Sequence, residues 1–190
     1  LQGCPWDCLY CHNPELIDPR RPGTLAWDEV LAFLETRRGL LDGVVFSGGE
    51  ATRQDLRAAC GQVKALGFGV GLHTMGAYPR RLAEVLPLAD WVGFDIKGPP
   101  GAVERIVGRR GVQPKVAVSL RLLLASGVDY QVRTTWGPGV LSRAEAEAAL
   151  AWAHRQGVAD PVLQLVRVEG TRPSFRAELQ ADLGQIRDQN

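Results

Sequence analysis

The chain has 190 residues, of which 45% are hydrophobic and 23% are charged, a composition typical of a globular protein rather than a disordered or collagen-like one. Its 22 basic and 21 acidic residues leave a net charge of +1, which provides no field that would attract nucleic acid or an anionic membrane surface. No apolar run approaches the roughly 20 residues that a transmembrane helix needs. We therefore expect a soluble, cytoplasmic protein that binds neither nucleic acid nor a membrane.

Strand-like and helix-like segments alternate along the chain. Five apolar segments of strand length are bounded by Gly, Pro or Asp: 43–47, 68–73, 91–96, 129–134 and 162–166. The segments with helical periodicity are 26–37, 54–66, 79–86, 112–125 and 142–155. Gly67 and Gly127 follow two of these helices where a left-handed C-cap is expected. Ser142 and Glu145 form a capping-box pattern at the start of the last helix.

This alternation predicts an α/β fold. Strands separated by helices need crossover connections, which make the sheet parallel. The nearly continuous apolar strand 43–46 predicts burial on both faces. A complete eightfold barrel needs about 200–250 residues. Five strands, with a first strand before Cys4 missing or truncated, predict a partial, open TIM-like barrel of the (β/α)6 type within a single domain of residues 1–190. A doubly wound sheet is the competing arrangement.

Three of the four cysteines lie close together, as Cys4, Cys8 and Cys11 in a Cys-x3-Cys-x2-Cys pattern within an N-terminal loop (residues 3–24). Three thiolates on one short loop can surround a single compact metal centre. A zinc site would need a fourth ligand. His12 is adjacent to Cys11 and poorly placed to share its metal, while Cys60 is isolated in a helical segment and is expected to be a buried, small apolar residue.

Other chemistry is compatible with these cysteines. The segment from Cys8 to His12 matches the c-type haem attachment motif, but that interpretation leaves Cys4 unused and requires export. A redox dithiol also leaves one cysteine without a role. A 4Fe–4S cluster held by three cysteines keeps one iron free of protein ligands, and a small molecule can bind and react at such an open position.

Polar or glycine-rich positions lie at the C-terminal ends of four predicted strands: Gly48, Gly49 and Glu50; His73 and Thr74; Asp95 and Lys97; and Arg133. These ends form the ligand-binding face of parallel β/α folds, so we predict that the four groups meet beside the cysteine loop. Each group also has a purely structural interpretation. The glycines could form a common turn, the Asp95 and Lys97 side chains a solvated ion pair, and Arg133 a packed rim residue.

Together, the cysteine spacing, the aromatic Tyr10 before the third cysteine and the Gly-Gly-Glu segment resemble the radical S-adenosylmethionine (SAM) superfamily. Within it, the chain is most similar to glycyl-radical-enzyme activases, especially those of anaerobic ribonucleoside-triphosphate reductases. This likeness is carried by Leu1-Gln-Gly-Cys4, Cys11-His-Asn-Pro-Glu-Leu-Ile17, Val45-Phe-Ser-Gly-Gly-Glu50, Phe94-Asp-Ile-Lys97, Tyr130-Gln-Val-Arg-Thr-Thr135 and Val162-Leu-Gln164. The Cys-His-Asn-Pro stretch also occurs in pyruvate formate-lyase activases.

The resemblance implies specific cofactors and partners. Cys4, Cys8 and Cys11 would hold a 4Fe–4S cluster that binds SAM. The residues expected around the cofactor are Tyr10, His12, Gly48, Gly49, Glu50, Thr74, Asp95, Lys97 and Arg133. An electron from a flavodoxin-like donor would cleave SAM, and the 5′-deoxyadenosyl radical would take a hydrogen atom from a glycine of the partner reductase. No side chain beyond the cofactors is expected to be catalytic.

Three other functions remain open at this point. A radical SAM enzyme of this type could act on another glycyl-radical enzyme, of the pyruvate formate-lyase type, or on a small molecule. The chain could instead be a non-catalytic zinc-binding module, or an inactive fragment that retains the motifs.

One segment departs from the family pattern, which usually has Asp-Thr-Asn-Gly where this chain has His73-Thr-Met-Gly76. The change replaces two polar groups near the expected site, and Thr74 remains available as a ligand contact. His73 is either a new polar contact or a strand-end histidine bonded to the backbone, and we expect the latter. We expect His154, in the last helix, to be a plain surface residue.

Overall fold

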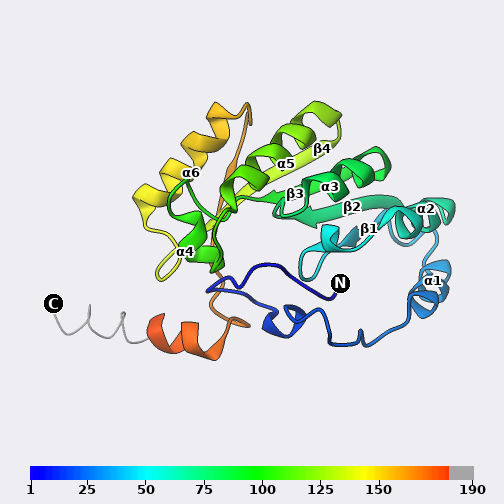
Figure 1. Ribbon diagram of the computed structural model, residues 1–190. Coiled ribbons are helices and arrows are strands. Elements are labelled where there is room, and N and C mark those ends of the chain that lie inside the picture. Colours follow the sequence, from blue (N-terminus) through cyan, green and yellow to red (C-terminus); the bar gives the residue numbers. More distant parts are fainter. Residues whose placement is uncertain (180–190) are drawn as a thin grey trace.

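The computed structural model describes residues 1–179 (Figure 1). The strands are β1 Gly43–Phe46, β2 Gly69–Thr74, β3 Trp91–Asp95, β4 Asp129–Trp136 and β5 Val162–Leu165. The α-helices are α1 Trp27–Glu35, α2 Arg57–Ala65, α3 Pro79–Val85, α4 Val103–Val107, α5 Gln113–Ser126 and α6 Arg143–Arg155, and residues 173–179 are also helical. Short 3-10 helices are η1 Pro14–Leu16, η2 Ala51–Arg53 and η3 Leu86–Leu88. The single domain expected for residues 1–190 includes 180–190, which lie outside the described residues.

The five strands form one parallel sheet in the order β1-β2-β3-β4-β5. Helices α2, α3, α5 and α6 cover one side of this sheet, and the N-terminal loop crosses on the other (Figure 1). A doubly wound sheet would reverse its strand order at a switch point, and none occurs among the described strands. The predicted partial barrel is therefore confirmed. Among the described elements no strand precedes Cys4, and β1 forms one edge of the sheet.

An apolar core joins the helices to the sheet. Phe94 of β3, Leu82 of α3 and Leu120 of α5 are completely buried members of one hydrophobic cluster. Burying each such side chain contributes about 1.5–3 kcal/mol. This packing holds the strands in a fixed arrangement, so that the loops at their C-terminal ends are presented on a rigid frame.

The helix ends follow the signals in the sequence. Gly67 and Gly127 end α2 and α5 in the left-handed region, with φ of +89° and +75°. The capping box at α6 is complete, since the Ser142 hydroxyl accepts a hydrogen bond from Glu145 N at 3.2 Å and the Glu145 carboxylate accepts one from Ser142 N at 2.8 Å. Helix α4 was not predicted, because its five residues are too few to show helical periodicity.

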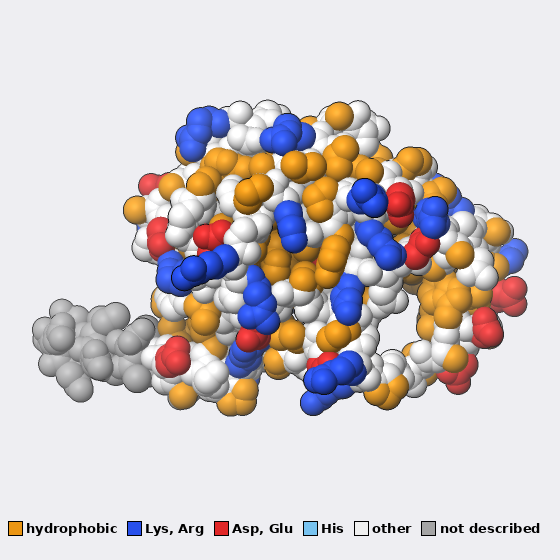
Figure 2. Space-filling view, viewed as in Figure 1, with side chains coloured by type: hydrophobic (Ala, Val, Ile, Leu, Met, Phe, Trp, Pro, Cys, Tyr) orange, Lys and Arg blue, Asp and Glu red, His pale blue; other side chains and the backbone are white. Residues whose placement is uncertain are grey.

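The prediction that strand 43–46 is buried on both faces is wrong. Val45 is 50% exposed, and on α1 the side chain of Phe33 is 53% exposed. Helix α1 meets β1 through Trp27, whose ring lies 6.1 Å from that of Phe46, and its buried Leu34 belongs to the main apolar cluster. Figure 2 shows an opening between the segment that carries α1 and the rest of the molecule. Apolar residues in β1 therefore remain exposed because no layer covers them fully.

Among residues 1–179, no helix has the combination of length and apolar character that crossing a bilayer requires.

Candidate cofactor site

The cysteine loop is closed by hydrogen bonds to itself and anchored to helix α4. Gly3 N donates to Leu16 O at 2.8 Å, which closes the loop around its cysteines. Asp7 N donates to Val107 O at 2.9 Å, and Leu9 N donates to the carbonyl of Ile106 at 3.1 Å. The short helix α4 thus fixes the part of the loop on either side of Cys8.

The cysteine loop and the strand ends surround one cavity of about 160 Å³. Its lining includes all three loop cysteines together with residues at or just after the C-terminal ends of β1, β2 and β3: Ser47, Gly48, Gly49, His73, Thr74, Met75, Asp95 and Lys97. The predicted convergence on one mouth is confirmed for these groups. The volume is below the roughly 300 Å³ of common ligand pockets, so a compact group fits inside and a larger ligand would extend across the open mouth.

Gly48 and Gly49 allow the loop after β1 to lie directly against the cysteine loop. Gly48 adopts φ +123°, which disfavours other residues. A Cβ on Gly49 would lie 2.8 Å from the Gly3 carbonyl carbon and 3.1 Å from Leu16 O. The two loops are joined there, since Glu50 N donates to Gly3 O at 3.0 Å. The glycine pair is therefore needed for this close backbone approach.

The close approach predicts that Gly49→Ala destabilises the site. Because the added methyl meets backbone atoms, the loops must separate, at a cost of about 2 kcal/mol. Urea denaturation measures this loss, and iron bound after reconstitution should fall with it. Gly61→Ala is the matched control, since a Cβ at Gly61 of α2 meets nothing within 4 Å. Equal stability of the two variants would contradict the prediction.

The Glu50 side chain lies outside the cavity lining. It is completely buried, and its carboxylate accepts four hydrogen bonds: from Thr52 N at 3.0 Å, Thr52 Oγ1 at 2.6 Å, Thr74 Oγ1 at 2.7 Å and Met75 N at 2.9 Å. A buried carboxylate needs such donors to replace water. Glu50 therefore positions Thr74 at the end of β2 and Met75 in the loop that follows, rather than facing a ligand.

Asp95, Lys97 and Arg133 form a partly buried ionic group. Asp95 accepts a hydrogen bond from Arg133 Nε at 2.9 Å, and Lys97 Nζ lies 3.5 Å from its other oxygen. Burial alone would raise the pKa of Asp95, but Lys97 and Arg133 outweigh burial and lower it. Asp95 and Lys97 line the cavity, as predicted from their common side, whereas Arg133 is not among the lining residues and holds Asp95.

Tyr10 lies beneath Lys97, whose ammonium is 5.4 Å from the centre of the tyrosine ring. Burial alone would lower the pKa of Lys97, but Tyr10, Asp95 and Cys8 outweigh it and raise the pKa, so the side chain stays charged. The Tyr10 hydroxyl is buried, with the side chains of Lys97 and Thr135 as its polar neighbours. The cavity thus contains a cation available to a ligand.

Burial favours the neutral form of the Cys4 and Cys8 thiols. Burial raises the pKa of Cys4 to about 12, and it also raises the pKa of Cys8. Since the thiolate is the ligand form, bound iron would have to supply the positive charge that stabilises it. In the described part of the chain, no three His, Cys, Asp or Glu side chains are gathered tightly enough to hold one metal ion.

The number of cysteine ligands in the loop bears on the choice of metal. A structural zinc site needs four protein ligands. A 4Fe–4S cluster held by three cysteines would leave one iron without a protein ligand. Three thiols on one loop therefore fit such a cluster as a donor set. The fourth cysteine, Cys60, is completely buried in α2, and its predicted role as a small core residue is confirmed.

Of the three histidines, His73 differs from expectation. His73 does not bond to the backbone; its Nδ1 lies 3.5 Å from Ser47 Oγ and its ring meets Trp91 edge-on at 5.5 Å. The expectation of a backbone-bonded histidine is wrong, because the ring turns toward the cavity, where the neighbouring strand offers a hydroxyl. His12 also lines the cavity, and its Nε2 lies 2.8 Å from Arg167 O. His154 is exposed on α6, as expected.

The position of His73 predicts a pH effect on stability. Burial and the nearby Arg133 lower the pKa of His73 from its ordinary value of 6.5. The unfolded chain therefore binds this proton more readily, so the stability from neutral His73 is present above about pH 6.5 and is lost as the pH falls below it. Urea denaturation at pH 7.5 and 5.5 should show a smaller loss for His73→Gln than for the wild type. Equal losses would contradict this assignment.

Sequence reasoning missed some lining residues, namely Trp6, Asn13, Ile17, Ser47 and Met75. Most lie inside or next to a motif that was recognised, so proximity in sequence was the available signal. No sequence signal indicated the contacts from residues 166–179, which reach the cysteine loop from the opposite end of the chain.

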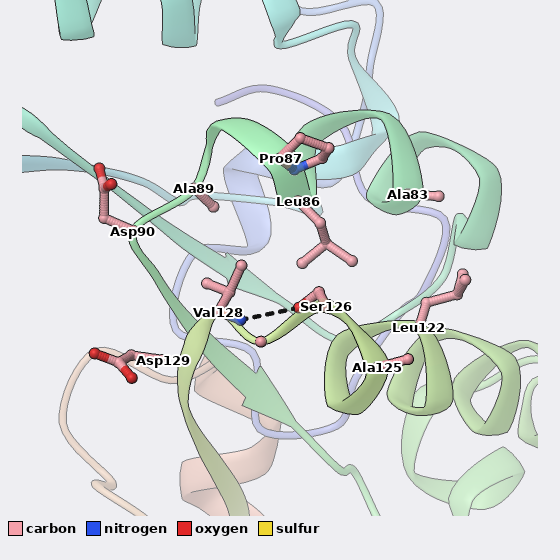
Figure 3. Close-up of a pocket in the computed structure, with 11 residues that line it drawn as sticks. Ala83, Leu86, Pro87, Ala89, Asp90, Leu122, Ala125, Ser126, Val128 and Asp129 are labelled. Carbon is pink, nitrogen blue, oxygen red and sulfur yellow. Dashed lines mark hydrogen bonds between the residues drawn. The ribbon is translucent and has the colours of Figure 1, made fainter.

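A second, wider cavity of about 670 Å³ lies at the opposite end of the sheet (Figure 3). It is lined by the connections that precede β3 and β4, including Leu86, Val128 and Asp129. Asp90 at its edge is already bonded to Lys64 at 2.8 Å and to Val70 N at 2.7 Å. With mainly small and apolar side chains and no cysteine or histidine, this cavity lacks the groups that a reactive site needs.

Comparison with known proteins agrees with this site. Residues 1–158 match the Radical SAM superfamily, which uses a 4Fe–4S cluster and SAM. Over 106 residues the chain is 33% identical to a pyruvate formate-lyase-activating enzyme from Clostridium pasteurianum, covering 51% of this chain and 43% of that enzyme. The chain spans about half the length of the curated relatives it matches.

Two solved structures share the fold. Native anSMEcpe with bound AdoMet superimposes with a TM-score of 0.63 at 16% identity, covering 87% of this chain and 49% of that one. Coproporphyrinogen III oxidase (HemN) from Escherichia coli, described as a radical SAM enzyme, has a TM-score of 0.63 at 11% identity, covering 100% of this chain and 51% of that one. Because the family match extends over most of its length, the chain belongs to the radical SAM superfamily.

Proposed function

We propose that this chain is a glycyl-radical-enzyme activase whose cluster is held by Cys4, Cys8 and Cys11. The observation that carries the proposal is that three thiols of one loop line the same cavity as the ends of β1, β2 and β3. When bound, the cluster and SAM supply the one-electron chemistry that produces a carbon-centred radical. The similarity to a pyruvate formate-lyase-activating enzyme supports an activase.

The side chains of the cavity have separate tasks in this proposal. The Lys97 ammonium offers a positive charge to a carboxylate of SAM, and Asp95 with Arg133 keeps it in place. Gly48 and Gly49 bring backbone groups against the ligand, while Thr74, held by Glu50, closes the adjacent side. Tyr10 offers its ring, and His12 closes the outer edge.

The partner that we propose is an anaerobic ribonucleoside-triphosphate reductase, supported by the sequence segments shared with activases of that class. A flavodoxin-like electron donor and a cytoplasmic location belong to the same proposal. An open barrel suits a protein substrate, because a loop that carries the target glycine needs a wide entrance. The match to a pyruvate formate-lyase-activating enzyme favours a pyruvate formate-lyase type of partner as the second candidate.

Anaerobic reconstitution tests this function in two stages. The protein with SAM and dithionite should produce 5′-deoxyadenosine, and addition of the reductase should give the electron paramagnetic resonance signal of a glycyl radical. A protein that contains about four irons but forms no 5′-deoxyadenosine would overturn the activity. Product without a glycyl radical on the reductase would overturn this choice of partner, and the same assay with a pyruvate formate-lyase would test the second.

Elemental analysis separates the activase from a zinc-binding module. Brown protein with about four irons per chain supports the activase. Colourless protein with one zinc and no iron would contradict it.

A further inference from the structure

The C-terminal segment, defined here as residues 166–179, folds back onto the cysteine loop, and Figure 1 shows its orange and red ribbon beside the dark blue N-terminal chain. The carbonyl of Arg167 contacts the His12 ring nitrogen at 2.8 Å. Phe175 and Leu179 pack in a buried apolar cluster with Tyr10. The C-terminal segment thus packs against the cysteine loop, although the contacting residues lie more than 150 positions apart in the sequence.

Arg172 is the charged residue that this packing brings to the loop. Its Nη2 donates a hydrogen bond to the carboxylate of Asp7, the residue that precedes Cys8. Its Nε, in contrast, is buried and has no hydrogen-bond partner among residues 1–179. Leaving such a donor unsatisfied costs about 1–3 kcal/mol, so it points to an acceptor supplied by a bound group.

Arg172 therefore places a guanidinium beside the residue that precedes Cys8, outside the lining of the cavity. A second cation, Lys97, lines the cavity, and its ammonium lies 5.4 Å from the ring centre of Tyr10 in the same cysteine loop.

We propose that Arg172 tunes the cluster, its Nε–H donating a hydrogen bond to a sulfur on the Cys8–Cys11 side and its charge favouring the reduced state. This inference rests on the proposed function. Reduction adds one electron from an external reductant to the bound cluster and makes it more negative by one charge, with no proton transferred. Hydrogen bonds to cluster sulfurs and nearby positive charge both make that addition easier.

The test is a potentiometric titration of the reconstituted protein, followed by the electron paramagnetic resonance signal of the reduced cluster. Arg172→Met removes the charge and every hydrogen-bond donor of the side chain but leaves an unbranched, apolar side chain in its place. We expect the one-electron reduction equilibrium to become about tenfold less favourable, a shift of 59 mV to lower potential. Arg176→Met is the matched control: Arg176 lies on the same segment and donates to Thr171 O instead of to the cysteine loop.

The outcomes are distinct. An Arg172→Met protein that holds four irons and titrates at the wild-type potential overturns the inference, as does an equal shift in Arg176→Met. If Arg172→Met does not retain the cluster, Arg172→Lys decides, because lysine keeps the charge but lacks Nε. A smaller shift of the reduction potential in the same direction supports the inference, and an unchanged potential overturns it. A wild type without a cluster overturns the proposed function as well, whereas a wild type that forms 5′-deoxyadenosine leaves only the role of Arg172 in question.

Discussion

Replacing Cys8 with alanine is expected to lower the iron content of the reconstituted protein from about four per chain to less than about one, and to reduce 5′-deoxyadenosine to background. Cys8 is buried between the anchors of the loop at Asp7 and Leu9, so no other thiol can move into its place. Iron analysis and product chromatography measure the two effects.

Cys60→Ala is the matched control for this substitution. It removes the same thiol from a buried position in α2, outside the cavity, and should retain the cluster and the product. A Cys8→Ala protein that still binds four irons and cleaves SAM would show that the cluster is held elsewhere.

Replacing Glu50 with glutamine should lower the free energy of unfolding by about 3 kcal/mol. The carboxylate accepts hydrogen bonds at both oxygens, with three donors at Oε1 and Met75 N at Oε2. A glutamine can keep an oxygen at the first position, but its amide nitrogen then faces the Met75 N–H, one donor against another. Urea denaturation of the two proteins gives the difference.

Glu147→Gln provides the control for loss of a carboxylate. Glu147 pairs with Arg143 at 2.8 Å on the exposed face of α6, and such surface pairs contribute less than about 0.5 kcal/mol. If Glu50→Gln proved as mild as Glu147→Gln, the buried network around Thr74 would not stabilise the fold.

The site combines a local motif with distant supports. The cysteines are close in sequence, but their loop is positioned by Val107 of α4, by the glycines after β1 and by the C-terminal segment. Each support comes from a different part of the chain, so the position of the loop depends on the tertiary fold as well as on its own sequence. This explains why substitutions at Gly49 and Arg172 are expected to alter the cluster without touching a cysteine.

The sequence alone was sufficient to predict the parallel α/β fold, the cysteine loop and the meeting of Gly48, His73 and Asp95 at one mouth. Local signals carry this information, because hydrophobic periodicity defines the strands and parallel strands place their C-terminal ends on one edge. The capping box at Ser142 and the left-handed glycines after α2 and α5 were recognisable for the same reason, since each depends on residues adjacent in the chain.

Only the tertiary structure decided which side chains face the cavity and which support it. Glu50 and Arg133 were predicted to contact the cofactor, yet Glu50 is enclosed by hydrogen-bond donors and Arg133 holds Asp95. The exposure of Val45 and the contact of Arg172 with Asp7 likewise depend on elements remote in sequence. Periodicity identifies the element on which a residue lies, but the direction of a buried polar side chain is set by the partners that the folded chain brings within hydrogen-bonding distance.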